Sequence, residues 1–254
     1  MSLNLAEYLV VLSSPRSVPS EAFRSIRTNL QASMGDGLKS IAMVSSWGSE
    51  GKSLVCANLA AAFAQLFFEV ILIDGDLRRP TLSRLFNCET NLGLAEHLHR
   101  DPEAQSLEDL TIKTDVRNLS FLPAGQVRGN PADLLAGPSL GKALQAFTDK
   151  DLFVVIDTPP VSACSDALMV GAKVSGVVMV VNPARWRGDV EVRLKDSLLN
   201  SNVNILGVVL NGVDQKEAVY GYGDKNAYAY GYGYGESVRE DSNKSILPWA
   251  KWFS

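Results

Sequence analysis

Long apolar runs recur along this 254-residue chain, and several of them end in an acidic or amide residue. Five runs are unbroken and rich in aliphatic residues, as in strands buried on both faces of a sheet: 40–44, 69–74, 151–157, 176–181 and 205–211. A shorter alternating run predicts one more strand at 119–123. Helical patterns lie between the runs, at about 21–31, 54–63 and 189–199, and one begins after Asn130. This alternation predicts an α/β fold with a doubly wound, mainly parallel sheet.

The segment that follows the first strand, Ser45–Ser53, reads S-S-W-G-S-E-G-K-S. Small residues let a loop turn its backbone N–H groups inward, and the following helix adds the positive end of its dipole, so this segment predicts a phosphate site. Lys52 would reach the β- and γ-phosphates, and Ser53 would hold Mg²⁺. We expect Lys52 to be a surface-facing cation that folding does not need. The alternative is an ordinary turn, because Ser46 stands where the G-x-x-x-x-G-K-[ST] pattern has glycine.

Acidic residues end two of the predicted buried strands. Asp74 and Asp76 follow the second run, and Asp157 ends the run at 151–157. Because carboxyl ends of parallel strands meet at one edge, these carboxylates would gather beside the phosphate site, where they need a lysine or a metal ion. The alternative for the first pair is a turn with Asp as a helix cap, but a cap explains only one Asp.

The N-terminal part predicts an extended lead-in over 5–18 and then a helix, capped by Ser17 or Ser20. Three charged residues recur every third position and share one face: Glu21, Arg24 and Arg27. Apolar residues lie on another face: Phe23, Ile26 and Leu30. The charged face is either a solvated stripe with internal ion pairs or a subunit contact.

The C-terminal part differs in residue composition from the rest of the chain. Residues 220–235 hold six of the seven tyrosines, interleaved with Gly and Ala: Tyr220, Tyr222, Tyr228, Tyr230, Tyr232 and Tyr234. Such a composition cannot build a core, so we expect a domain over 1–215, with the helix at 17–32, and a flexible tail over 216–254. The alternative is a low-complexity linker.

Composition narrows the function classes. The net charge of −4 and the pI of about 5.3 give no sign of a nucleic-acid partner. The three cysteines are widely spaced, which indicates neither a disulfide framework nor a zinc site and fits a reducing cytoplasm.

Together these segments resemble the bacterial tyrosine kinases (BY-kinases) of capsule and exopolysaccharide synthesis, over about 17–235. Glu21–Arg27 reads E-A-F-R-S-I-R, similar to the family's E-x-x-R-x-x-R oligomerisation motif. Asp74–Arg78 is similar to its second Walker motif, and Ile156–Pro160 to its Walker B motif. The chain departs from the family's Pro-Gly-Glu-Gly-Lys-Ser-Thr at 48–54, and it has Arg128-Gly129 where the family tends to place prolines.

The resemblance implies a protein-tyrosine autokinase that binds ATP or ADP with Mg²⁺. Its nucleotide contacts would be Gly48, Ser49, Glu50, Gly51, Lys52, Ser53 and Leu54, with Asn211 reading the base. Its magnesium ligands would be Ser53, Asp76 and Asp157. Its catalytic residues would be Lys52, Asp74, Asp76, Arg78 and Asp157. Asp74 would accept the phenol proton, a role that it could exchange with Asp76.

The resemblance also implies an assembly. Unphosphorylated subunits would form a ring, an octamer, in which a tail tyrosine enters a neighbour's site. A transmembrane polysaccharide co-polymerase would act as activator, separate or fused upstream, and would hold the kinase at the cytoplasmic face of the membrane. The alternatives are a MinD/ParA-like ATPase, which would carry a signature Lys where this chain has Trp47, and a catalytically weak ring scaffold.

Overall fold

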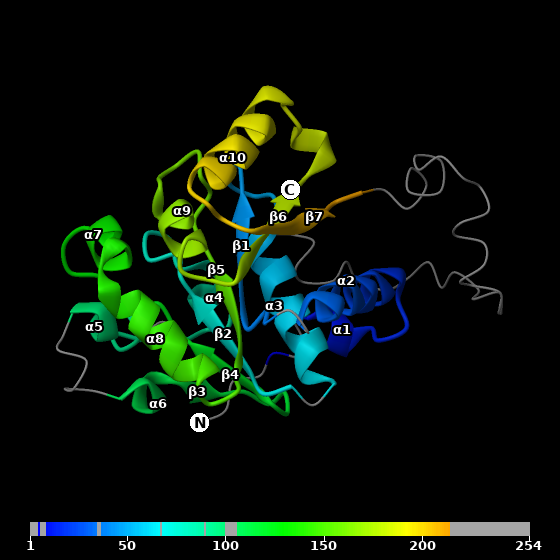
Figure 1. The fold of residues 1–254 in the computed structure, drawn as a ribbon. Coiled ribbons are helices and arrows are strands. Elements are labelled where there is room, and N and C mark those ends of the chain that lie inside the picture. The colour runs from blue at the N-terminus through cyan, green and yellow to red at the C-terminus, as the bar shows by residue number, and fades with distance from the viewer. Residues whose placement is uncertain are drawn as a thin grey trace, which may run out of the picture.

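The computed structural model describes Leu5 and residues 9–34, 37–66, 68–88, 90–99 and 106–213. These residues form one seven-stranded sheet with the order β3-β4-β2-β5-β1-β6-β7 (Figure 1). Every neighbouring pair is parallel except β3 and β4, so the predicted fold class is confirmed. The strands are β1 (Ser40–Ser45), β2 (Val70–Asp74), β3 (Ile112–Lys113), β4 (Leu119–Leu122), β5 (Phe153–Asp157), β6 (Gly176–Val181) and β7 (Ile205–Leu210).

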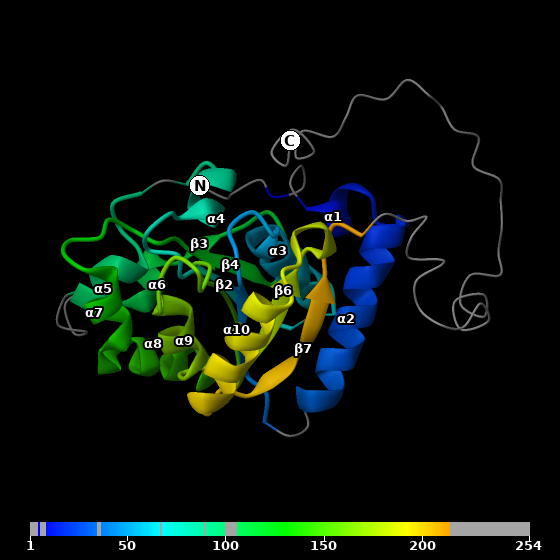
Figure 2. The same ribbon diagram turned by 90° about the horizontal axis from the view of Figure 1, so that it is seen from above.

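Helices cover both faces of the sheet (Figures 1 and 2). One face packs against α1 (Val10–Ser13), α2 (Val18–Met34), α3 (Lys52–Ala64) and α4 (Thr81–Leu85). The other packs against α5 (Leu94–His99), α6 (Leu107–Leu110), α7 (Pro131–Ala136), α8 (Pro138–Thr148), α9 (Asp166–Gly171) and α10 (Asp189–Asn200). A 3₁₀ turn, η1 (Pro183–Arg185), follows β6.

The two helical layers explain why consecutive residues in the middle of the central strands are apolar. In β1, Ile41 and Met43 belong to the core cluster under α2 and α3, whereas Ala42 and Val44 belong to the cluster under α8 and α9. Successive side chains of a strand point to opposite faces, so both sets must be apolar. The phosphate loop therefore starts from a strand that is buried on both faces.

Helix α3 is enclosed between the sheet and α2. Ten of its residues, Val55 to Ala64, are buried in sequence, as expected for a helix that is apolar on all sides. Phe63 near its end packs on Phe153 of β5, with ring centroids 4.5 Å apart. The loop that precedes this helix is thus held by the protein core at both ends.

The N-terminal segment differs from the expected extended lead-in, which is wrong at residues 10–13. The chain forms the single turn α1 there, because this turn buries both Leu9 and Val11 in the core. Helix α2 is longer than predicted and begins at Val18. The Ser17 hydroxyl accepts a hydrogen bond from the Ser20 amide at 3.4 Å, so Ser17 lies at the cap, while the Ser20 hydroxyl is buried against the Ser14 carbonyl.

Candidate active site

The phosphate loop joins the carboxyl end of β1 to the first turn of α3. Ser49 and Gly51 both take the left-handed backbone conformation, with φ of 62° and 79°. Glycine adopts this conformation freely, whereas a serine does so at a cost. Ser46, which stands where the motif has glycine, has no positive φ and is fully buried. The serine at position 46 is therefore compatible with the conformation of the loop, whereas the backbone of Ser49 is strained.

Glu50 braces this loop from inside. Its buried carboxylate accepts hydrogen bonds from the amide of Trp47 at 2.8 Å and from the amide of Asn182 at 3.2 Å. Its carbonyl accepts one from Asn211 Nδ2 at 2.8 Å. The loop is thus fixed to the segments that follow β6 and β7. Reading of the base by Asn211 stays a prediction, and in this structure the Asn211 amide group contacts the loop.

Lys52 lies at the start of α3 and is buried, with only 7% of its side chain exposed. Its Nζ donates to Asp157 Oδ1 at 2.6 Å. Burial alone lowers the pKa of Lys52, but the charge of Asp157 and this hydrogen bond outweigh it and raise that pKa. The expectation of a surface-facing cation is wrong, because the lysine must neutralise a carboxylate that has no contact with solvent.

Asp74 ends β2 directly beside Asp157 of β5 in the register of the sheet. Its Oδ2 accepts hydrogen bonds from both the amide and the hydroxyl of Ser83, each at 2.8 Å. Burial, together with the nearby charge of Asp157, raises the pKa of Asp74 to about 7. Ser83 was not predicted, since nothing in the sequence distinguishes this serine of a short helix from any other.

Gly75 allows the chain to pass close over β5. A Cβ at this position would lie 2.6 Å from the Asp157 carbonyl oxygen, and the Gly75 amide donates to that oxygen at 3.0 Å. Asp76 follows at the same edge and is 6% exposed, and its Oδ1 accepts from the Arg79 amide at 2.9 Å. Burial raises the pKa of Asp76. The structure thus brings all three predicted carboxylates to one place.

These carboxylates fit a magnesium ion. Asp74 Oδ1 and Asp157 Oδ2 are buried and accept no hydrogen bond from any described residue. Among the described residues no three His, Cys, Asp or Glu side chains form a complete metal-binding group. Magnesium is typically held by one or two carboxylates, with phosphate and water oxygens completing its shell. Ser53, in the first turn of α3, is half-buried and adds a hydroxyl to this edge.

The Arg78 side chain is held in an ion pair with a buried carboxylate. Its Nε and one terminal nitrogen donate to the two carboxylate oxygens of Asp166, at 2.8 and 3.0 Å, and Asp166 is fully buried. This ion pair raises the pKa of Arg78. The predicted catalytic Arg78 is thereby fixed to the start of α9. Asp166 was missed, because a single acid at a helix start carries no signal of its partner.

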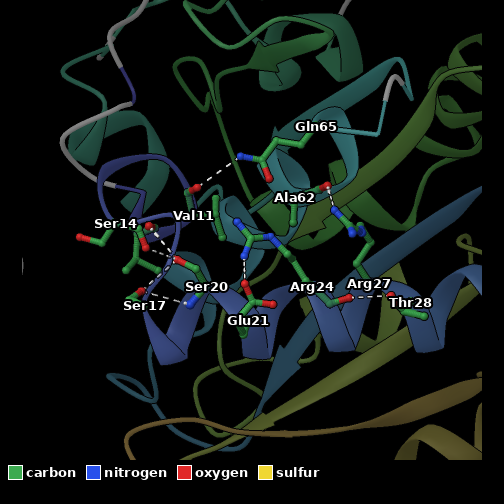
Figure 3. A network of polar contacts seen from close by, with 11 residues as sticks. Val11, Ser14, Ser17, Ser20, Glu21, Arg24, Arg27, Thr28, Ala62 and Gln65 are labelled. Carbon is green, nitrogen blue, oxygen red and sulfur yellow. Dashed lines mark hydrogen bonds and ion pairs between the residues drawn. The ribbon is translucent and has the colours of Figure 1, made fainter. Parts of the chain in front are cut away.

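The predicted oligomerisation residues are divided between two environments (Figure 3). Glu21 and Arg24 form an ion pair one turn apart, and both side chains are half-buried. Arg27 instead turns toward α3, is 9% exposed, and donates to the Ala62 carbonyl at 2.8 Å. Two further residues predicted to contact the nucleotide lie at either side of Lys52: Leu54 is in the first turn of α3, and Gly48 is in the loop, where its carbonyl accepts from Arg185.

The six predicted acceptor tyrosines, from Tyr220 to Tyr234, lie outside the described residues. None of the helices in the ranges given above is both long and apolar enough to cross a membrane.

Comparison with known proteins agrees with this geometry. The ParA family model described as "NUBPL iron-transfer P-loop NTPase" matches residues 38–248. The tyrosine-protein kinase YwqD of Bacillus subtilis is 34% identical over 84% of this chain and 90% of its own length. The crystal structure of the chimerical protein CapA2B2 superposes with a TM-score of 0.77 at 32% identity, covering 84% of this chain and 93% of that one.

The rival ATPase class is less similar. The cell division ATPase MinD of Pyrococcus furiosus gives a TM-score of 0.57 at 27% identity, covering 70% of this chain and 74% of its own. It shares the fold, as expected of one P-loop superfamily. The similarity to YwqD over most of both chains, together with the family model, shows that the chain belongs to the bacterial tyrosine-protein kinases, within the ParA-like P-loop NTPases.

Proposed function

We propose that this chain is an ATP-dependent autokinase that transfers the γ-phosphate to tyrosines of its own C-terminal tail. One observation carries the proposal: Lys52, Asp74 and Asp157 converge at the start of α3, beside the braced loop. The tyrosine-rich segment 220–235 supplies acceptors in the same chain.

The loop amides and Lys52 bind the phosphates. Lys52 Nζ exchanges Asp157 for oxygens of the β- and γ-phosphates, which then supply its compensating charge. Ser53, Asp76 and Asp157 would hold Mg²⁺, whose positive charge would offset the negative charge of the transferring phosphoryl group. Asp157 Oδ2, which is buried and accepts no hydrogen bond within the described part of the chain, supports this assignment.

Asp74 accepts the proton of the acceptor. The phenol oxygen attacks the γ-phosphorus and forms the new P–O bond, while the bond from that phosphorus to the β–γ bridging oxygen breaks and leaves its electron pair on ADP. The phenol proton moves to Asp74, and Ser83 keeps this carboxylate oriented through two hydrogen bonds. A pKa near 7 suits a base that works at neutral pH. In the alternative assignment, Asp76 takes this role.

The assembly is also part of the proposal. Unphosphorylated subunits form a ring, an octamer, through the exposed part of α2, and the tail of one subunit serves its neighbour. A transmembrane co-polymerase of polysaccharide export, separate or fused upstream, activates the kinase at the cytoplasmic face of the membrane. Phosphates on the tail add negative charge that opposes its return to the acidic site.

The test is phosphosite mapping by mass spectrometry of full-length protein incubated with Mg-ATP. Phosphotyrosine at positions 220–234 is expected in the unmodified chain and absent from Lys52→Met and Asp74→Asn variants, whose folding is checked by circular dichroism. ATP hydrolysis without phosphotyrosine would instead favour the MinD-like ATPase, and failure to bind nucleotide would favour the ring scaffold.

A further inference from the structure

Strand β7 forms one edge of the sheet, and one of its faces is uncovered (Figure 2). On the face toward α2, Leu206 and Val209 pack against the core. Val208 points to the opposite face, because it stands beside Met179 of β6, which belongs to the core under α10. Leu210 follows two positions later and shares that face. Val208 is 56% exposed there and Leu210 is 41% exposed, so α10 leaves this end of the sheet open.

Exposed apolar side chains are concentrated around this edge. Among the described residues, nine large apolar side chains are exposed, and six of them lie between Trp186 and Val213. Val192 and Leu199 are two helical turns apart and share one side of α10, the helix that precedes β7. A single exposed apolar residue is ordinary, whereas a group of them is typical of a binding surface. The group on α10 and β7 is called the β7 surface: Val192, Leu199, Val208 and Leu210.

The sequence of β7 does little to keep another segment away. Ile205–Leu210 reads I-L-G-V-V-L and contains no charged residue and no proline, which are common protections of an edge strand. The register with β6 shifts once, near the start of the strand, and is regular from Gly207 to Leu210. Within the described ranges no strand pairs with the outer side of β7. We therefore expect this edge to be covered by a segment that the described residues do not include.

The chain itself supplies an apolar segment beyond this edge. It leaves β7 at Leu210, and its described part ends at Val213. Residues 214–245 contain no Leu, Ile, Met, Phe or Trp. Five such residues then occur within eight positions: Ile246, Leu247, Trp249, Trp252 and Phe253. None of the motifs discussed above explains this segment.

We infer that the segment 246–253 docks on the β7 surface of the same chain, with its two tryptophans on Val208 and Leu210. A coil of the length of residues 214–245 spans about 30 Å, whereas a strand of the length of β7 spans about 20 Å, so the segment can return to the strand from which the chain departs. Such a tether gives the segment an effective concentration in about the millimolar range, at which even a weak apolar contact is occupied. Docking would hold both ends of the tyrosine-rich segment at one edge of the sheet, and it does not depend on the proposed kinase function.

The first experiment joins the two partners covalently in the full-length chain. Val208→Cys and Ala250→Cys are introduced together, the protein is exposed to oxidised glutathione, and peptide mapping identifies the disulfide. The bond should form within one chain at least about tenfold faster than in the control pair Leu92→Cys/Ala250→Cys, because tethered docking brings position 250 to β7. Leu92 is the matched control, since it is 45% exposed but lies before α5.

The second experiment measures the burial of the two tryptophans directly. The chain has four tryptophans, so Trp47→Phe/Trp186→Phe leaves the emission of Trp249 and Trp252 alone. Acrylamide should quench this emission less than it quenches the emission of a free peptide of residues 244–254. The difference reports the docked fraction without an added cysteine.

Substitutions on the two partners then test the contact in the same background. Val208→Asp should shift the docking equilibrium toward the open form by about tenfold, because docking would bury a carboxylate that has no partner. Leu247→Asp should have the same effect without altering β7. Leu92→Asp is the control and should leave the quenching unchanged.

Several outcomes would overturn the inference. A disulfide between two chains would place the segment on a neighbouring copy instead. Quenching equal to that of the free peptide, or unchanged in Val208→Asp, would show that the segment does not occupy the β7 surface. Shielding that appears only after anionic lipid vesicles are added would assign the segment to a membrane surface. Since no measurement requires nucleotide, failure of the kinase proposal would leave all of these results unaltered.

Discussion

Lys52 and Asp157, which are 105 positions apart in the sequence, form a buried ion pair of 2.6 Å at the centre of the nucleotide site. Asp157 is fully buried and Lys52 nearly so. Removing one member of such a pair leaves the other charge without compensation, which is far more costly than replacing both.

Lys52→Met is therefore expected to destabilise the nucleotide-free protein at neutral pH by about 3 kcal/mol or more. The double variant Lys52→Met/Asp157→Asn should recover most of this loss, because it leaves no unpaired charge. Urea unfolding of the two variants and of the unmodified chain checks the prediction. Equal stability of the two variants would show that the unpaired Asp157 carboxylate has no cost, which would contradict the prediction.

Asp74 should make stability depend on pH. Burial raises its pKa to about 7 in the folded protein, whereas an unfolded Asp titrates near 4. Between these values the folded state binds more protons than the unfolded state, so the free energy of unfolding falls as the pH rises through this window and levels off above it. We expect a loss of about 2 kcal/mol from pH 5 to pH 7.

This pH dependence is measured by urea unfolding in EDTA without nucleotide. Asp74→Asn should flatten it, since the substituted side chain does not ionise. Asp149→Asn, at an exposed position, is the control and should keep the slope of the unmodified protein. An unaltered slope in Asp74→Asn would assign the effect to another group.

Replacing Ser49 by glycine should make the folded protein more stable. Its φ of 62° costs a side-chain-bearing residue about 1 kcal/mol or more, and part of any gain is offset by the greater freedom of glycine in the unfolded chain. Ser49→Gly is expected to stabilise the protein by about 0.5 kcal/mol. Gly51→Ala, at φ 79°, should have the opposite sign, and thermal unfolding of both compares them.

Arg24 and Arg27 should behave differently when replaced. Arg27→Ala removes a buried hydrogen bond to the Ala62 carbonyl and should destabilise the subunit itself by about 1–3 kcal/mol. Arg24→Ala should change the unfolding free energy by less, about 0.5 kcal/mol, since its half-buried ion pair with Glu21 lies within one turn of a helix and such pairs contribute little.

Light scattering of dephosphorylated protein then tests the proposed ring. If α2 is a subunit contact, Arg24→Ala should reduce the mass from oligomer toward monomer while the subunit stays folded. A ring of full mass in Arg24→Ala would remove this arginine from the contact, whatever Arg27→Ala does.

The fold and the centre of the site were predictable because both follow from local patterns. An apolar run that ends in an acid identifies a buried strand and places its carboxylate at the carboxyl edge, which is how Asp74 and Asp157 could be assigned together. Glycine and small residues before Lys52 identify the phosphate loop in the same way.

The remaining features depend on contacts that periodicity cannot specify. Glu50 is braced by residues 132 and 161 positions away. Periodicity placed Arg27 on a face of α2 but could not show that a carbonyl of α3 lies opposite that face. The burial of Lys52 follows from the closeness of β5, which only the order of strands in the sheet determines.

Helix α3 links the phosphate loop to helix α2. Its first turn carries Lys52 and Ser53 at the phosphates, and near its other end the Ala62 carbonyl is held by Arg27 of α2 (Figure 3). A helix of 13 residues is about 20 Å long and bends little when it is enclosed by a core. The phosphate loop and helix α2 are therefore joined by one buried helix, so that a substitution in α2 at Arg27 alters the support of the element that carries Lys52.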